Sequence, residues 1–416
     1  MSTLTYGCIG EHLGHSYSAS IHQKLSGDNY QLIELSPDEL PRFLEERKFQ
    51  GINVTIPYKK TVLPYLDHID ALAEQIGAVN TIVCQNGQLY GYNTDAFGLM
   101  ALFSAHDIHV KGKRILVLGT GGTATMAKVV LGHMGALKVQ IVSRTPKGDQ
   151  IGYERLPGDF SDFDYILNTT PCGMYPHEED APLSLEGFRR LSAVVDVIYH
   201  PLRTRLLLDA KQRGIKAVGG LYMLVAQAVK ASEYFFDRTY PEHTINSLYH
   251  DMIKEKRNIV LIGMPSSGKT TLGRAIADKL FMPFYDTDAL YTEQYGMPPH
   301  ESIMHLGEGA FRQREEEILL SVSSCRGGVI ATGGGAVLSK RGMEALSRHG
   351  VVVWINRPLD ELTFTENRPL TATKEDMEKR FLERKPLYEA YADLVTTCKS
   401  TLSDSIDDVL QRLQQS

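Results

Sequence analysis

The sequence predicts an α/β protein built around parallel sheets. Short apolar runs rich in β-branched residues alternate with helix-length amphipathic stretches along nearly the whole chain, which is the pattern of βα units. Two of these runs lead into a glycine-rich turn and then a helical stretch, at Gly119 and at Gly263. The clearest runs are Arg114–Leu118, Val139–Val142, Tyr165–Leu167, Val194–Val197, Ile259–Ile262, Gly328–Ala331 and Val351–Ile355.

Length and composition exclude several classes of protein. At roughly 150 residues per domain, 416 residues suggest two or three domains. The chain is 43% hydrophobic and 23% charged, as globular proteins are, which excludes a disordered tail, a collagen-like fibre and a coiled-coil rod. Lys and Arg number 44 against 50 Asp and Glu, so the net charge is −6 and no basic surplus indicates a nucleic-acid or anionic-membrane partner.

Cysteine usage and the absence of targeting patterns favour the cytoplasm. The five cysteines are odd in number and scattered without a Cys-x-x-Cys pair, which indicates a reduced protein without structural zinc. No run approaches the roughly 20 apolar residues of a membrane helix, and the first ten residues match neither a signal nor a transit peptide. We therefore expect a cytoplasmic protein that acts on small molecules and binds neither nucleic acid nor membrane. The oligomeric state stays open.

Changes in the pattern predict three domains, at residues 1–100, 101–255 and 256–416. Up to about Leu99 the strands are short and the loops polar, and a new unit begins at Lys111. The same alternation restarts at Arg257, after a helical segment over Pro241–Lys256. Because no Gly/Ser-rich or Pro-rich linker separates the last two units, we expect them to be closely tethered.

The run Ile259–Ile262 ends in a phosphate-binding motif. G-x-x-x-x-G-K-T begins at Gly263 and is followed by an amphipathic stretch to Leu280. In this strand–loop–helix setting, backbone N–H groups and the helix N-terminus hold the phosphates of a nucleoside triphosphate, the lysine reaches the outer phosphates, and the threonine hydroxyl ligates Mg²⁺. The residues expected at ATP are Gly263, Ser266, Ser267, Gly268, Lys269, Thr270 and Thr271.

Polar groups downstream of this motif indicate its substrate. The next strand ends in an acidic pair, at the strand edge where ligands of parallel sheets bind. Taken singly, the arginines and glycines that follow have ordinary readings as surface charges and turns. In this order, however, the set resembles shikimate kinase from Arg257 to Ser416. The set comprises Asp286, Asp288, Arg312, Gly333, Gly334, Gly335, Arg368 and Arg384.

The resemblance implies a role for each of these residues. Asp288 binds the substrate hydroxyls and accepts the proton, and Asp286 works near Mg²⁺. Arg312 and Arg384 clamp the substrate carboxylate, which suits the bidentate guanidinium fork. The three glycines lie against the substrate ring, and Arg368 is the lid arginine that closes over ATP. Ser266 departs from the family, which usually has glycine there.

The run Ile115–Leu118 leads into a variant of the dinucleotide fingerprint G-x-G-x-x-G/A. Such a match alone also fits a simple tight turn. The next strand ends in Ser143, Arg144 and Thr145, where an NAD enzyme carries an acid for the ribose 2′-hydroxyl. Because arginine suits a 2′-phosphate, NADP is favoured over NAD. The glycine-turn residues expected at the cofactor are Gly119, Gly121, Gly122, Thr123 and Ala124.

Three N-terminal clusters supply hydroxyls, amides, one lysine and one aspartate, as a small polyol carboxylate requires. They occupy residues 10–22, 51–60 and 77–95. Each alone fits capping and turn chemistry. Together they resemble shikimate dehydrogenase, from Thr5 to about Lys254. The resemblance implies a three-layer α/β substrate domain, completed by helices of about 221–255, plus a Rossmann-like NADP domain. A P-loop kinase domain with a parallel sheet follows.

By this resemblance Lys59 and Asp95 are the catalytic pair. Reducing a ketone leaves charge on its oxygen, which a proton-bearing cation can stabilise and quench while a carboxylate orients it. The segment at residues 168–174 lies beside the nicotinamide. The other implied contacts are Ser16 and Ser18 to the substrate carboxylate, Tyr199 near it, Thr55, Asn80 and Gln227 to the ring hydroxyls, and Gly220 to the cofactor. His12 and Ala19 depart from the family, which usually has proline at those places.

The two resemblances describe consecutive reactions. One half is expected to reduce 3-dehydroshikimate with NADPH, and the other to phosphorylate the resulting shikimate with MgATP. One alternative is a metabolite sensor built from the same domains without catalysis, although Lys59, Asp95, Lys269, Thr270 and Asp288 are all retained. Another is a dehydrogenase that prefers quinate and runs oxidatively, which the attached kinase disfavours.

Overall fold

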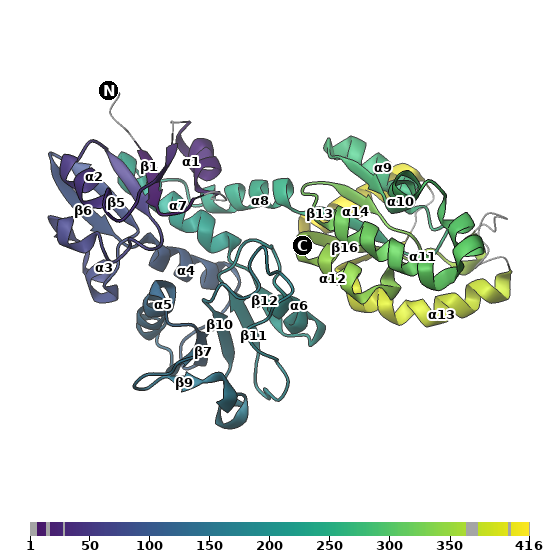
Figure 1. Cartoon of the computed structure of the whole chain (residues 1–416), viewed down its shortest axis with the longest axis horizontal. Coiled ribbons are helices and arrows are strands. Elements are labelled where there is room, and N and C mark those ends of the chain that lie inside the picture. Colours follow the sequence, from purple (N-terminus) through teal and green to yellow (C-terminus); the bar gives the residue numbers. More distant parts are fainter. Residues whose placement is uncertain (1–5, 14–16, 28–29, 363–372, 398–400, 416) are drawn as a thin grey trace. The chain divides into compact units, whose positions relative to one another are not determined.

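The computed structural model describes residues 6–13, 17–27, 30–362, 373–397 and 401–415. The chain divides into two compact units, Met1–Asp251 and Met252–Ser416, and each is described by itself (Figure 1). Helix α8 (Thr244–Lys256) contains the boundary. The runs that the sequence marked as strands all form strands of these units, and the predicted α/β class is confirmed.

The first sheet of unit 1 has the strand order β2-β1-β3-β5-β6-β4. Strands β1 to β3 are parallel, whereas β5 is antiparallel to both β3 and β6. The sheet is therefore mixed. Strands β5 and β6 are joined by a two-residue hairpin at Asn86 and Gly87, whose φ angles are both positive. The strands are β1 (Tyr6–Gly10), β2 (Tyr30–Glu34), β3 (Gly51–Val54), β4 (His68–Ile69), β5 (Thr81–Gln85) and β6 (Gln88–Tyr92).

Helices cover both faces of this sheet. One face packs Leu40 and Leu44 of α2 (Leu40–Glu46) against Ile52. The other packs Phe235 of α7 (Leu221–Phe236) against Tyr6. The remaining helices of this part are α1 (Ser18–Ser26) and α3 (Ala71–Ile76). Sheet and helices form the expected three layers, with α7 returning from the far end of the unit.

The second sheet of unit 1 is wholly parallel, in the order β12-β11-β10-β7-β8-β9. Apart from Arg114 at the start of β7, its central strands are buried, as doubly covered parallel strands are. The strands are β7 (Arg114–Leu118), β8 (Lys138–Ser143), β9 (Ile151–Gly152), β10 (Tyr165–Asn168), β11 (Ala193–Asp196) and β12 (Lys216–Val218). Helices α4 (Thr94–Ala105), α5 (Gly122–His133) and α6 (Arg205–Gln212) accompany them. The strand order reverses between β7 and β10, where ligands of such sheets bind.

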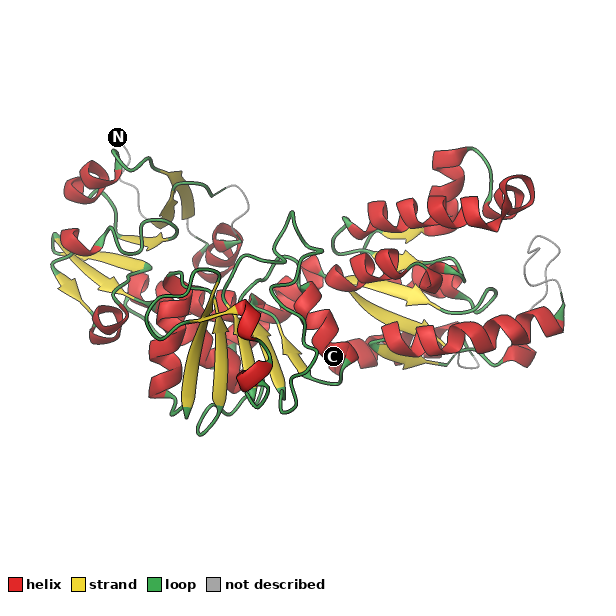
Figure 2. Cartoon of the chain, turned by 60° about the horizontal axis from the view of Figure 1, so that its bottom comes forward, coloured by secondary structure: helices red, strands yellow, loops and turns green. Residues whose placement is uncertain are grey.

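Unit 2 has one parallel sheet in the order β14-β15-β13-β16-β17. Figure 2 shows strands with helices packed against them in both units. The strands are β13 (Asn258–Ile262), β14 (Phe284–Asp286), β15 (Val329–Ala331), β16 (Gly350–Ile355) and β17 (Leu394–Thr396). The helices are α9 (Lys269–Leu280), α10 (Thr287–Tyr295), α11 (Pro299–Ser323), α12 (Lys340–His349), α13 (Lys374–Tyr391) and α14 (Leu402–Gln415).

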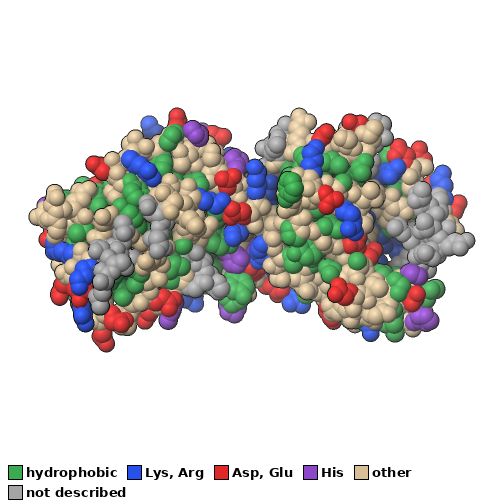
Figure 3. Space-filling view, turned by 90° about the horizontal axis from the view of Figure 1, so that it is seen from above, with side chains coloured by type: hydrophobic (Ala, Val, Ile, Leu, Met, Phe, Trp, Pro, Cys, Tyr) green, Lys and Arg blue, Asp and Glu red, His purple; other side chains and the backbone are tan. Residues whose placement is uncertain are grey.

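The surface carries charges of both signs. On the face in Figure 3, Lys and Arg side chains are interspersed with Asp and Glu. Within the described ranges, no helix has both the length and the apolar character needed to span a membrane. The four cysteines among the described residues are free thiols.

Candidate active sites in the two units

Unit 1 contains a cavity of about 500 Å³ at the carboxyl ends of its strands. Its polar side chains come from β3, from helices α1, α4, α5 and α7, and from loops that adjoin strands of both sheets. Nine of the residues predicted from the sequence line it, namely Ser18, Thr55, Lys59, Asn80, Asp95, Thr123, Tyr199, Gly220 and Gln227. Ser16 lies outside the described residues.

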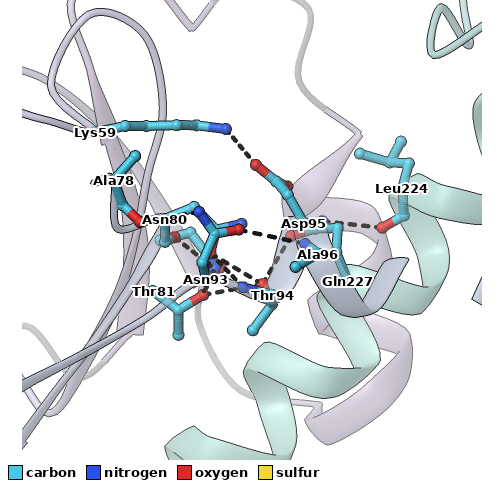
Figure 4. A network of polar contacts seen from close by, with 11 residues as sticks. Lys59, Ala78, Asn80, Thr81, Asn93, Thr94, Asp95, Ala96, Leu224 and Gln227 are labelled. Carbon is cyan, nitrogen blue, oxygen red and sulfur yellow. Dashed lines mark hydrogen bonds and ion pairs between the residues drawn. The ribbon is translucent and has the colours of Figure 1, made fainter. Parts of the chain in front are cut away.

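Lys59 and Asp95 meet in this cavity although 36 residues separate them. Lys59 follows β3, and its Nζ donates to Asp95 Oδ2 over 2.5 Å (Figure 4). Asp95 stands in the first turn of α4, where the helix dipole favours a carboxylate. The side chains are 22% and 17% exposed, so the pair is partly shielded from water but open to a ligand. A lysine cation held in this way can stabilise a developing oxyanion and donate a proton.

The amides of Asn80 and Gln227 are oriented by Thr94. Asn80 Oδ1 accepts from the Thr94 backbone N–H at 2.7 Å, which leaves the Asn80 NH₂ group for the cavity (Figure 4). Gln227 Oε1 accepts from Thr94 Oγ1 at 3.4 Å, and its Nε2 donates to the carbonyl of Leu224 at 2.9 Å. Both amides therefore present N–H donors, as recognition of ring hydroxyls requires.

Three cavity-side residues were missed from the sequence. Asn53 lines the cavity and accepts from Tyr30 Oη at 2.6 Å. Its position two residues before Thr55 on an extended segment places both side chains on one face, which is a signal that could have found it. Thr94 and Cys8 gave no comparable signal, because the contact of Thr94 with α7 and the position of Cys8 at the cavity depend on the tertiary fold.

The glycine turn after β7 fits a dinucleotide pyrophosphate. Gly119 has φ of 109°, a left-handed conformation that favours glycine, and lies against Thr169 and Thr170. A Cβ on Gly121 or Gly122 would meet nothing within 4 Å, so the turn is open to a ligand. No side chain caps the start of α5, whose first N–H groups remain available for phosphate.

The end of β8 carries the other residues predicted at the cofactor. Ser143 is buried and its Oγ accepts from the Thr145 N–H at 3.1 Å, which shapes the turn. Arg144 between them is exposed. Ala124 is buried in α5, and Thr123 reaches the cavity. A guanidinium at this strand end fits a 2′-phosphate.

In unit 2 the loop between β13 and α9 has the geometry of a phosphate loop. Gly263 and Gly268 have φ of 149° and 90°, and Ser266 has φ of 64°. The family's usual glycine at position 266 is explained by this left-handed conformation, which costs serine about 1 kcal/mol. Lys269 Nζ donates to the carbonyls of Gly263 and Met264 at 2.9 and 2.8 Å. Ser267 is buried in the loop, and Thr271 is exposed in the first turn of α9.

The two residues predicted at Mg²⁺ are in contact. Thr270 Oγ1 donates to Asp286 Oδ2 at 2.8 Å. The other carboxylate oxygen of Asp286 accepts from the backbone N–H groups of Asp288 and Ala289, which caps α10. One hydroxyl and one carboxylate are the donor set of a magnesium ion that is held mainly by phosphates and water.

Each glycine of the triplet 333–335 lies against a different part of this site. A Cβ on Gly333 would stand 3.0 Å from Asp288 Oδ1, and one on Gly334 would stand 2.6 Å from Pro265 of the phosphate loop. A Cβ on Gly335 would come to 2.3 Å from Arg312 Nη1. The glycine loop thus lies close to the acid, the phosphate loop and the arginine at once.

The two predicted arginines are anchored by groups that the sequence did not reveal. Arg312 donates to Glu315 at 2.6 Å and to Glu308 at 3.0 Å. Arg384 donates to the carbonyl of Gly334 at 3.1 Å, and its pKa is lowered by burial. Arg368 lies outside the described residues.

Tyr388 joins α13 to both loops of the site. Its hydroxyl donates to the Gly334 carbonyl at 2.7 Å and contacts the sulfur of Met264 at 3.7 Å. Burial raises the pKa of Tyr388 to about 12. The ring stacks on Trp354 of β16, with centroids 5.6 Å apart. The tyrosine thus ties α13 to the glycine triplet and to the loop between β13 and α9.

Comparison with known proteins relates the chain to two families. A family model described as shikimate dehydrogenase substrate binding domain matches residues 8–82, and one described as shikimate kinase matches residues 265–414. The shikimate dehydrogenase (NADP(+)) of Clostridium beijerinckii is 39% identical over 245 residues, covering 55% of this chain and 90% of that enzyme. That of Clostridium perfringens is 37% identical over 268 residues, covering 59% and 97%.

Solved structures agree with these relatives. The chorismate mutase/shikimate 5-dehydrogenase fusion protein of Clostridium acetobutylicum has a TM-score of 0.56 at 35% identity, covering 61% of this chain and 98% of that one. Shikimate 5-dehydrogenase of Thermus thermophilus, in complex with NADP(H) and shikimate, has a TM-score of 0.54 at 30% identity, covering 60% and 99%.

Proposed function

Because the chain belongs to the shikimate dehydrogenase family and carries a shikimate kinase domain in the same polypeptide, we propose that it catalyses two consecutive steps. It is a bifunctional shikimate-pathway enzyme with an oxidoreductase half and a kinase half. The proposed steps are reduction of 3-dehydroshikimate to shikimate with NADPH and phosphorylation of the shikimate 3-hydroxyl with MgATP. The oxidoreductase half comprises a substrate domain, residues 1–100 with 221–255, and a cofactor domain within 101–255. The kinase domain is 256–416.

The contact between Lys59 and Asp95 inside a cavity that also reaches the glycine turn carries the dehydrogenase proposal. When bound, NADPH supplies the hydride. Lys59 stabilises the charge that develops on the substrate oxygen and delivers the proton, while Asp95 orients the ammonium group. Asn80, Gln227 and Thr55 hold the ring hydroxyls. Ser16, Ser18 and Tyr199 hold the carboxylate end.

The cofactor contacts follow from the turn geometry. Gly119, Gly121, Gly122, Thr123 and Ala124 form the turn that receives the pyrophosphate, and Gly220 lies at the cavity beside Val197. Arg144, between Ser143 and Thr145, holds the 2′-phosphate, so the cofactor is NADP(H).

In the kinase half, MgATP supplies the phosphoryl group when bound. Lys269 and the loop at 263–271 hold its phosphates, and Thr270 with Asp286 holds Mg²⁺. Asp288 accepts the proton of the attacking hydroxyl. Arg312, Arg384 and the glycine loop hold shikimate, and Arg368 closes over the nucleotide. The close approach of the glycine loop to Asp288, Arg312 and Pro265 supports this arrangement.

A sequential assay of the purified chain tests both steps. NADPH and 3-dehydroshikimate are added first and cofactor absorbance is followed, and then MgATP is added and ADP and shikimate 3-phosphate are measured. Lys59→Ala should abolish only the first step and Asp288→Asn only the second, so each variant is the other's control. Binding without turnover would support the sensor, and faster oxidation of quinate than of shikimate would support the quinate enzyme. We further propose a cytoplasmic location, which the free thiols support.

A further inference from the structure

Asp196, the last residue of β11, is fully buried beside the cavity loop that carries Val197 and Tyr199. Within the described part of the chain no lysine or arginine compensates its charge, and burial raises the pKa of its carboxyl to about 6. A buried carboxylate without a cation is costly unless hydrogen bonds satisfy it. The hydrogen bonds to Asp196 therefore decide whether its carboxylate is stable in this place.

Three donors from three segments converge on Asp196. Oδ1 accepts from Asn168 Nδ2 and from the backbone N–H of Ile198, both at 3.1 Å. Oδ2 accepts from Thr204 Oγ1 at 2.7 Å. Thr204 in turn caps α6 by accepting from the Leu207 N–H. The carboxylate thus connects the end of β10, the loop after β11 and the start of α6.

On the β10 side, the hydrogen bonds continue toward the glycine turn. Asn168 Oδ1 accepts from Thr170 Oγ1 at 2.7 Å and from its N–H at 3.1 Å, and Thr170 Oγ1 accepts from the Cys172 N–H. Thr169 and Thr170 lie against Gly119, and Met174 lines the cavity. Asn168 therefore shapes the loop that borders the proposed nicotinamide site.

On the β11 side, the loop held by Asp196 carries the wall of the cavity. Val197 and Tyr199 line it, and the Ile198 carbonyl accepts from the Gly220 N–H at 2.9 Å. A Cβ on Gly220 would stand 2.0 Å from the Val197 carbonyl oxygen, so this loop packs directly against the start of α7. Asp196 itself does not line the cavity.

We propose that Asp196 is a positioning residue of the dehydrogenase site, which holds the loops after β10 and β11 in one arrangement and thereby places the cofactor and Tyr199. This inference rests on the proposed function. Both carboxylate oxygens accept hydrogen bonds. An amide at the same place replaces one of these acceptors by an NH₂ group that faces another donor, so one of the two loops must shift. Misplacement by about 1 Å can cost 100-fold in rate.

The test compares Asp196→Asn with Asp164→Asn in the full-length chain. Asp164 is also buried but precedes β10, at the ends of the strands opposite to the cavity. Its carboxylate accepts from the Arg114 N–H and lies near Lys113 and Arg190. Asp196→Asn should raise the KM for NADPH and the Kd for NADPH from fluorescence titration by about tenfold or more. Asp164→Asn should change neither, and both should keep the kinase activity of wild type.

Thr204 supplies a second route to the same answer if Asp196→Asn does not fold. Thr204→Val removes the 2.7 Å hydrogen bond and should raise the Kd for NADPH several-fold, and Thr204→Ser should restore it. An Asp196→Asn protein that binds NADPH as wild type does, or an equal loss in Asp164→Asn, would overturn the inference. Absence of reduction by the wild type would instead refute the proposed function.

Discussion

A single hydroxyl group, that of Thr94, connects the two amides expected to recognise the substrate ring. The Thr94 hydroxyl lies 3.2 Å from Asn80 Oδ1 and 3.4 Å from Gln227 Oε1, so its proton can be donated to either amide oxygen. Thr94→Val keeps the shape and removes this proton. We expect the KM for 3-dehydroshikimate to rise about tenfold, as the loss of a buried hydrogen bond of about 1–1.5 kcal/mol predicts. Thr94→Ser should restore it, and a KM unchanged in Thr94→Val would contradict the role.

His22 makes the stability of unit 1 dependent on pH. The ring stacks on Tyr30, with centroids 4.1 Å apart, and burial lowers its pKa from 6.5 to about 3. Below pH 6.5 the unfolded chain binds a proton that the folded chain does not, so stability is complete above pH 6.5 and is lost as the pH falls toward 3. From pH 7 to pH 5 the loss is about 2 kcal/mol. The free energy of unfolding of unit 1 can be measured by urea titration at several pH values, with loss of dehydrogenase activity as the signal. It should fall with pH in this way in wild type and less steeply in His22→Phe.

At the scale of one element, the glycine loop after β15 leaves no room for side chains. Gly335→Ala would force the Arg312 guanidinium away from its present place, because the new Cβ would come to 2.3 Å from Nη1. We expect the KM for shikimate in the kinase assay to rise at least about tenfold while the KM for ATP changes little. Gly309→Ala in α11 is the control, since a Cβ there meets nothing within 4 Å. Equal kinetics in the two variants would show that the loop does not position Arg312.

Elements were predictable to the extent that local pattern decides them. The central strands of the second sheet and of the sheet in unit 2 are mainly apolar runs, so the sequence alone located them. The short strands β9, β12 and β17 were not predicted. The antiparallel half of the first sheet was not foreseen, although the dipeptide Asn86-Gly87 between strand-like runs signals a hairpin. Glu308 and Glu315 stand at helical spacing from Arg312 within α11, so this spacing is a signal that could have paired them with it. The role of Asp196 could not be found, because Asn168 and Thr204 are brought to it by the tertiary fold.

At the scale of the whole molecule, each proposed site is built from residues of one compact unit. Ligands should therefore stabilise the units selectively. At 100 times its Kd, NADP⁺ should add about 2.7 kcal/mol to unit 1 alone, and ATP should act on unit 2 alone. In calorimetry the matching transition should shift by about 5–10 °C. A single transition that moves equally with either ligand would refute independent unfolding.

The stack of Trp354 on Tyr388 gives the kinase half an intrinsic fluorescence signal. Trp354 is the only tryptophan of the chain, so indole emission arises from unit 2 alone, whatever happens in unit 1. Its neighbour Tyr388 donates a hydrogen bond to the Gly334 carbonyl, where shikimate is expected to lie. Titration with shikimate should therefore change the emission without any label, and Tyr388→Phe should weaken that response. An unlabelled chain would thus report the arrival of the intermediate at the second site in real time, while NADPH absorbance reports its formation at the first.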